Sequence, residues 1–186
     1  EGGDVHVIGG GAVLVGISEH LLARGQELAD VGVTMNLAPV ADLVDIPDPS
    51  SNAPIGRWGR EYGQSATTSQ DRAIAFARGM EAAGVIPTYK HFPGLGRVKD
   101  NTDTSAGVVD STTTRSADTA VSVIFGAAIA AGAPVIMVSS ATYALIDSSA
   151  PAVFSSKIVT DMLRTEMGFS GVVITDDVSA AVRTGT

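Results

Sequence analysis

Residues 155–175 read SSKIVTDMLRTEMGFSGVVIT and contain, in order, a helix pattern, a glycine and a short run rich in β-branched residues. The helix pattern extends to Met167, and Gly168 can adopt the left-handed conformation that ends a helix. Residues 172–175 are apolar without alternation, which indicates a strand buried on both faces. The stretch therefore predicts a helix followed by a strand of a parallel sheet.

The same order of helix, glycine and strand occurs three more times. The sequence predicts helices over 18–31, 70–83 and 115–131, each followed by a strand, over 33–37, 85–89 and 135–138. Alternating helices and buried strands with short links indicate successive parallel strands. This α/β pattern predicts four such strands, or five when residues 5–8 are included. It fits both a (β/α) barrel and a doubly wound open sheet.

The segments that follow the predicted strands are long, about 38–69, 92–113 and 140–154, and they are rich in polar residues. The carboxyl ends of parallel strands meet at one rim in either type of fold. We therefore expect the active site at this rim. The candidate residues there are Asp42, Arg57, Arg60, His91, Asp100, Asp103, Asp176 and Asp177.

Composition excludes some classes of partner. The formal net charge is -8, whereas a nucleic-acid partner requires a basic surface. No stretch reaches the roughly 20 apolar residues of a membrane span. The chain contains no Cys and opens at Glu1 without Met, so we expect that a natural start precedes it. These features do not establish the compartment, although secretion or the cell envelope is favoured over the cytoplasm.

Lys90 and His91 stand at the end of a predicted strand, where neighbouring side chains point to opposite faces unless the strand begins to turn. Pro93 and the glycines at 94 and 96 supply that turn. Both side chains would then face the rim, where they suit binding of hydroxyls or of an anion. An equally weighted alternative for His91 is a structural role in the loop.

Asp176 is the first residue after the last predicted strand, and it is placed to project into the mouth of a barrel. Asp177 is expected to cap the following helix. Retaining glycoside hydrolysis needs a carboxylate nucleophile and a proton donor about 5 Å apart. Asp176 can supply the nucleophile.

Other chemistries have less support in the sequence. His6, His20 and His91 lack the spacing of a helical metal site, and the chain contains no Gly-x-Ser-x-Gly motif. A Schiff base at Lys90, as in aldolase-type barrels, remains open.

Several motifs resemble those of glycoside hydrolase family 3, in particular its β-N-acetylhexosaminidase branch. Residues 90–96, KHFPGLG, closely resemble the family's KHFPGHG motif. Residues 36–42 (NLAPVAD) are similar to its N-x-A-P-V-x-D segment, and residues 174–179 (ITDDVS) to its [ST]-D-D-x-S nucleophile motif. Residues 1–3 (EGG) are similar to the end of its D-x-E-G-G loop. The likeness follows the chain in order over essentially its whole length.

The resemblance implies a (β/α)8 barrel of TIM type and a role for each matching residue. Asp176 would form the covalent glycosyl intermediate, and Lys90 and His91 would bind sugar hydroxyls. Arg60 would match the family's R-S-F-G arginine, although a short insertion leaves Arg57 as a rival. Asp42 would support the rim. The resemblance implies no metal and no organic cofactor.

Two features depart from the family pattern. Hexosaminidases of the family carry an Asp-x-His pair after KHFPGHG, whereas this chain reads Asn101-Thr102-Asp103. Asp103 is therefore the candidate acid/base, and a segment outside the chain is the alternative source. A full barrel needs about 250 residues, so residues 1–186 are expected to form the central portion of the catalytic barrel.

The resemblance implies retaining hydrolysis of terminal β-linked N-acetylglucosamine, for example from peptidoglycan or chitin fragments. The partner would be an amino-sugar glycoside. A β-glucosidase or β-xylosidase of the same family is an alternative. A non-catalytic sugar-binding barrel fragment is another.

Overall fold

A computed structural model describes residues 10–179 of the 186-residue chain. The main sheet contains four parallel strands, in the order β1 (Met35–Asn36), β2 (Ile86–Phe92), β4 (Val135–Val138) and β6 (Val172–Thr175). The four predicted strands are thus confirmed. A smaller parallel sheet pairs β3 (Val109–Asp110) with β5 (Thr142–Tyr143). The fifth strand expected over residues 5–8 lies outside the described residues.

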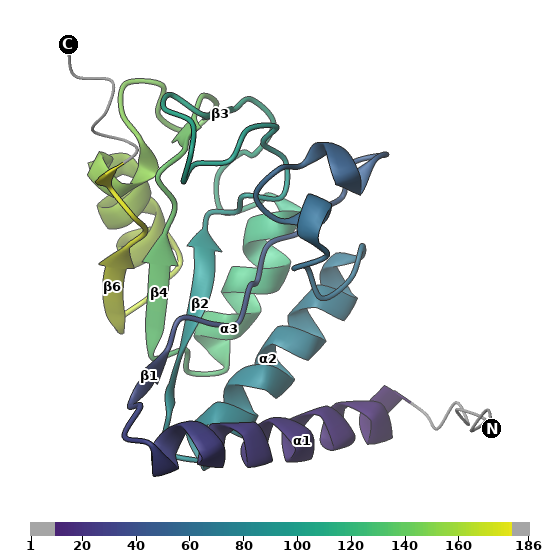
Figure 1. The fold of residues 1–186 in the computed structure, drawn as a ribbon. Coiled ribbons are helices and arrows are strands. Elements are labelled where there is room, and N and C mark those ends of the chain that lie inside the picture. The colour runs from purple at the N-terminus through teal and green to yellow at the C-terminus, as the bar shows by residue number, and fades with distance from the viewer. Residues whose placement is uncertain (1–9, 180–186) are drawn as a thin grey trace.

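Each strand of the main sheet lies beside the strand that follows it along the chain. Figure 1 shows α2 and α3 on one face of this sheet, with the arrowheads of β2 and β4 directed toward the same end. Sequential parallel strands with helices outside are the arrangement of a (β/α)8 barrel, in which each new strand extends the sheet in one direction. Within the described residues the barrel is incomplete, with β1 and β6 at the two edges.

The main helices lie where the repeated pattern predicts them, with differences at their starts, and the second begins at Ala66, ahead of the predicted residue 70. They are α1 (Gly10–Asp30), α2 (Ala66–Ala82), η3 (Ala120–Phe125) with its continuation α3 (Gly126–Ala130), and η5 (Lys157–Glu166). The first begins ahead of the predicted residue 18. The third begins five residues after the predicted residue 115, because Asp118 accepts the main-chain N–H groups of Thr114 and Ala120 and forms a capping turn first. Short 3₁₀ turns occupy η1 (Pro49–Ser51), η2 (Gly56–Trp58) and η4 (Ala152–Phe154).

Helix α1 packs closely on α2 through small residues. A Cβ added at Gly79 would lie 2.6 Å from Cβ of Leu21, and one added at Gly25 would lie 2.7 Å from Cβ of Ala83. Glycine at these two positions therefore allows the helix backbones to approach.

None of the helices within residues 10–179 combines the length and hydropathy needed to cross a membrane.

The core lies between the sheet and its helices. Phe92 from β2 meets Phe125 from η3 edge to face, with ring centroids 5.3 Å apart. All four residues of β4 are buried, as expected for a central strand. This packing fixes the direction of β2, the strand that carries Lys90 and His91.

The turn after β2 depends on two glycines with different roles. Gly94 has φ of +139°, a conformation that side chains disfavour. Gly96 packs directly on the main chain of the loop after β1, so that a Cβ there would overlap the carbonyl group of Leu43. The turn is thereby held against the β1 loop at the rim.

We expect Gly96→Ala to destabilise the protein by about 3 kcal/mol or more, because the backbone of the β1 loop must move to admit a methyl group. Gly126→Ala is the matched control. Its backbone is helical, and a Cβ there meets nothing closer than 4.0 Å, so its stability should stay equal or rise by up to about 1 kcal/mol. Denaturant unfolding measures both variants. Equal stabilities for the two would contradict the close approach at Gly96.

Candidate active site

The predicted site residues come together at the carboxyl ends of three strands. Asp42 follows β1, Lys90 and His91 lie in the last part of β2, and Asp176 follows β6. The His91 ring lies between two carboxylates, with Nδ1 2.7 Å from Oδ2 of Asp42 and Nε2 3.9 Å from Oδ2 of Asp176. The rim predicted from loop length is therefore a compact cluster of charged and polar groups.

Asp42 is fully buried and supports the rim from below. Its Oδ1 accepts the main-chain N–H of His91 at 3.1 Å and that of Leu95 at 2.7 Å. Burial alone would raise the pKa of Asp42, but its electrostatic and hydrogen-bond contact with His91 and the two main-chain hydrogen bonds outweigh it and lower the pKa. The side chain is thus held as a carboxylate at neutral pH.

Asp176 is positioned by the sheet itself. Its N–H donates to the carbonyl oxygen of Val138, so the β4–β6 ladder continues to this residue. Its Oδ1 accepts the N–H of Asp177, and its side chain is 16% exposed. A carboxylate that is partly exposed at a fixed strand end can reach a ligand.

Asp177 accepts the N–H and hydroxyl of Ser179, a local contact that resembles a helix N-cap. The helix that it is predicted to cap would lie, beyond Ser179, outside the described residues.

Lys90 and His91 both face this cluster although they are neighbours in a strand. The register between β2 and β4 shifts between Lys90 and Phe92. The alternation of a regular strand is therefore interrupted where both side chains are needed.

The half-buried ammonium of Lys90 lies in the field of the other site residues. Burial is the main cause that lowers its pKa, and the Arg60 charge lowers it further. Three carboxylates act in the opposite direction, namely those of Asp176, Asp42 and Asp103. Lys90 is therefore the point where the predicted residues interact electrostatically.

Arg60 and its rival Arg57 occupy different environments. Arg60 is partly buried and donates through Nη1 to the carbonyl oxygen of Pro54. Arg57 is exposed, and its guanidinium lies 5.8 Å from the ring centroid of Trp58. The electrostatic contact with Lys90 involves Arg60, which favours Arg60 as the substrate-binding arginine.

Asp103, the candidate acid/base, is exposed on the loop after β2. Its N–H donates to Oδ1 of Asn101, a local turn contact. It acts on the pKa of Lys90, so it lies within electrostatic reach of the cluster. Its role as acid/base stays a prediction.

Asn52 is a rim residue that the sequence did not single out. It is fully buried, and its Nδ2 donates to the carbonyl oxygens of Leu95 and Val98, both at 2.7 Å. Its Oδ1 accepts the N–H groups of Ile55 and Gly56. Asn52 thereby joins the loop that carries Arg60 to the turn after His91. In sequence it resembles an ordinary turn residue.

Arg97 is a second such residue. Its guanidinium forms two hydrogen bonds with the Asp45 carboxylate, at 2.8 and 2.7 Å, and two more with the Asp118 carboxylate, both at 2.9 Å. Bidentate pairs of this kind fix geometry as well as charge. Arg97 therefore ties together the loop after β1, the loop after β2 and the start of η3.

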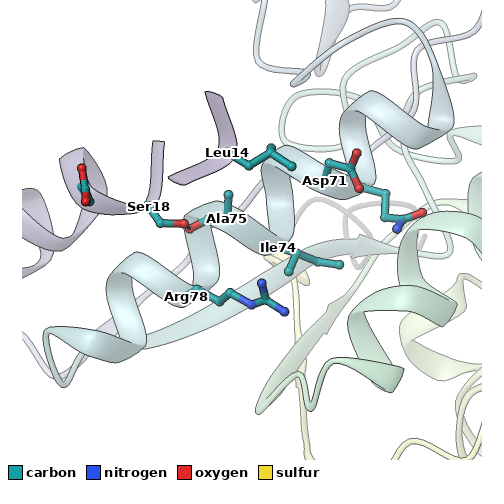
Figure 2. Close-up of a pocket in the computed structure, with 8 residues that line it drawn as sticks. Leu14, Ser18, Asp71, Ile74, Ala75 and Arg78 are labelled. Carbon is teal, nitrogen blue, oxygen red and sulfur yellow. Dashed lines mark hydrogen bonds between the residues drawn. The ribbon is translucent and has the colours of Figure 1, made fainter. Parts of the chain in front are cut away.

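The structure also contains a cavity away from these residues. Figure 2 shows this space of about 510 Å³ between α1 and α2, where Leu14, Ser18, Ile74 and Arg78 are among the lining residues. In its wall, the Ser18 hydroxyl donates to the carbonyl oxygen of Ala75. The cavity is separate from the rim cluster in both residues and elements.

Across residues 10–179, no group of His, Asp and Glu side chains is arranged to hold a metal ion.

A family model described as the glycosyl hydrolase family 3 N terminal domain matches residues 16–185. The chain belongs to this family. Membership confirms the predicted barrel-type fold, because the N-terminal domain of family 3 is a TIM-barrel-like α/β fold. The motifs at 90–96 and 174–179 lie within the matched region.

The most similar relatives include hexosaminidases. A β-hexosaminidase of Xylella fastidiosa strain M23 is 36% identical over 173 residues, which cover 89% of this chain and 47% of that protein. The crystal structure of a β-N-acetylhexosaminidase from Beutenbergia cavernae has 51% sequence identity and a TM-score of 0.87, over 90% of this chain and 49% of that one. M. tuberculosis LpqI matches with 29% identity and a TM-score of 0.75, over 91% and 48%. The chain thus spans about half the length of these proteins.

The buried Asp42 carboxylate leads to a prediction on acid stability. Its pKa in the folded family 3 domain is lower than the roughly 3.9 of an unfolded chain. The contribution of Asp42 to the free energy of unfolding is therefore fully present above the unfolded pKa, and it is lost as the pH falls through the folded pKa. We expect the unfolding free energy of the wild type to fall more steeply below about pH 4 than that of Asp42→Asn. Urea unfolding over this range measures both slopes, and parallel curves would contradict the lowered pKa.

Proposed function

We propose that the protein is a retaining glycosidase that releases terminal β-linked N-acetylglucosamine. The observation that carries the proposal is the Asp176 carboxylate, partly exposed at the end of β6 and 3.9 Å from the His91 ring. Membership of family 3 and the hexosaminidase relatives support the reaction class and the sugar. The activity belongs to the whole protein, because this chain spans only about half of those relatives.

In the first step, the Asp176 carboxylate attacks the anomeric carbon of the sugar. A carbon–oxygen bond forms to Asp176 while the glycosidic carbon–oxygen bond breaks. The departing oxygen takes a proton from a general acid, for which Asp103 is the candidate. The products are a glycosyl ester on Asp176 and the free alcohol of the leaving group.

In the second step, water hydrolyses this ester. The group that donated its proton now removes one from water, and the resulting oxygen attacks the anomeric carbon. The bond to Asp176 breaks, and the sugar leaves with the configuration that it had in the substrate. Two inversions at the same carbon therefore produce retention.

The cations and donors around Asp176 suit a sugar ring. Lys90 is half-buried and surrounded by three carboxylates, so its ammonium can donate to hydroxyl groups from a fixed position. Arg60 approaches the same region from the loop after β1. We assign Lys90, His91 and Arg60 to substrate binding.

Family 3 membership alone also allows a β-glucosidase or a β-xylosidase. Aryl β-N-acetylglucosaminide, β-glucoside and β-xyloside distinguish these activities in the full-length protein. We expect kcat/KM to be highest for the N-acetylglucosaminide. A preference for glucoside or xyloside would keep the mechanism and change the sugar.

Asp176→Asn is expected to reduce kcat by more than about 10³-fold while the fold is retained, because an amide cannot form the glycosyl ester. Asp177→Asn is the matched control, since it changes the adjacent carboxylate and keeps an oxygen that can accept from Ser179. Turnover of an aryl N-acetylglucosaminide measures both, with circular dichroism as the check on folding. Substantial turnover by folded Asp176→Asn would exclude it as the nucleophile.

Asp103→Asn is expected to slow substrates with poor leaving groups by about 10²-fold or more and to affect activated aryl glycosides less. A good leaving group departs without a proton, so the loss of an acid matters less for it. Rates for a series of aryl glycosides of increasing leaving-group pKa measure the difference. Equal losses across the series would remove Asp103 from the acid role.

A further inference from the structure

The contact between Asp42 and His91 determines where the ring carries its proton. Oδ1 of Asp42 is occupied by two main-chain N–H groups, and Oδ2 lies 2.7 Å from Nδ1 of His91. The pKa of Asp42 is lowered, so the group is a carboxylate at neutral pH, and a carboxylate only accepts hydrogen bonds. The proton of this hydrogen bond must therefore reside on Nδ1.

We propose that Asp42 is a positioning residue that holds neutral His91 as the Nδ1–H tautomer and leaves Nε2 as a bare acceptor beside Asp176. The partner of one ring nitrogen sets the state of the other. The catalytic consequence rests on the proposed glycosidase function, whereas the tautomer itself does not.

The surroundings of Nε2 give this tautomer a role in ligand selection. The charged groups around His91 are Asp42 at Nδ1, Asp176 near Nε2 and Lys90 as its neighbour in the strand. The 3.9 Å between Nε2 and Oδ2 of Asp176 exceeds a hydrogen bond, so a ligand oxygen can contact both atoms. Because both atoms are acceptors, the ligand group there must be a donor such as a sugar hydroxyl.

Asp42→Asn reverses this arrangement with little change in shape. The Asn Oδ1 can still accept from the N–H groups of His91 and Leu95, while its NH₂ group faces Nδ1. An NH₂ group requires an acceptor, so His91 would move its proton to Nε2. The gap beside Asp176 would then present a donor in place of an acceptor.

Nitrogen-15 NMR of the full-length protein labelled at histidine reads the tautomer directly. The His91 signals are assigned by their loss in His91→Ala and recorded at a pH where titration shows the ring to be neutral. We expect a protonated Nδ1 and a bare Nε2 in the wild type, and the reverse in Asp42→Asn. A protonated Nε2 in the wild type, or the same tautomer in both proteins, would overturn the proposal.

Asp110→Asn is the matched control for the loss of a buried carboxylate. Asp110 also accepts two main-chain N–H groups, from Thr112 and Thr113, and one side-chain hydroxyl, from Thr113. None of these contacts involves His91. The His91 tautomer should therefore stay as in the wild type, and a change there would show that the tautomer does not depend on the Asp42 contact.

A double-mutant cycle on kcat/KM tests whether Asp42 acts through His91. We expect Asp42→Asn alone to lower kcat/KM by about 10- to 100-fold, as loss of an orienting partner of histidine does. In the His91→Ala background, Asp42→Asn should alter kcat/KM by less than about twofold. If the losses in kcat/KM of the two single variants multiplied in the double variant, Asp42 would act independently of His91, and the positioning role would be overturned. If the protein proved not to be a glycosidase, the NMR result would still decide the tautomer.

Discussion

One buried carboxylate connects the parts of the rim. Asp42 comes from the loop after β1, yet all its hydrogen bonds go to the end of β2 and to the turn that follows. An ionised group without exposure is stable only when its oxygens are satisfied, and here both are. The position of His91, and through it the geometry beside Asp176, depends on this contact.

The turn after His91 is held from several sides at once. Asn52 donates to two of its carbonyl oxygens, and the buried hydroxyl of Tyr143 donates to a third, that of Gly94. Arg97 anchors its end by ion pairs to two other segments. These contacts fix the side of the rim that is proposed to bind the substrate. Asp103, in contrast, is exposed on a loop with local turn contacts, so the proposed proton donor and the proposed nucleophile are supported by different kinds of structure.

The sequence predicts the repeated units well because their signals are local. Residues 135–138 and 172–175 are strands over the full predicted ranges, since short β-branched runs favour strands. The prediction of burial on both faces is confirmed for β4 and wrong for β6, which is partly exposed because it lies at the edge of the described sheet. The pattern does not distinguish a barrel from a doubly wound sheet, because the two share the same local units. That choice needed the sheet order and the family comparison.

For the site, the motifs predict which residues come together. They do not predict the loop contacts that hold these residues in place. Lys90, His91 and Asp176 are predicted from strand ends and from family resemblance, and the structure brings them together. Asn52 and Arg97 were not predicted because they bind main-chain carbonyls and carboxylates 21 to 52 positions away, without any periodic signal.

The central claim is that Asp176 bonds to the anomeric carbon. Incubation of the full-length protein with an activated 2-deoxy-2-fluoro β-glycoside slows the second step and accumulates the glycosyl enzyme, which peptide mass spectrometry can locate. The account predicts one fluorosugar per molecule, attached to Asp176. Attachment to a different carboxylate, or turnover without any covalent sugar, would contradict it.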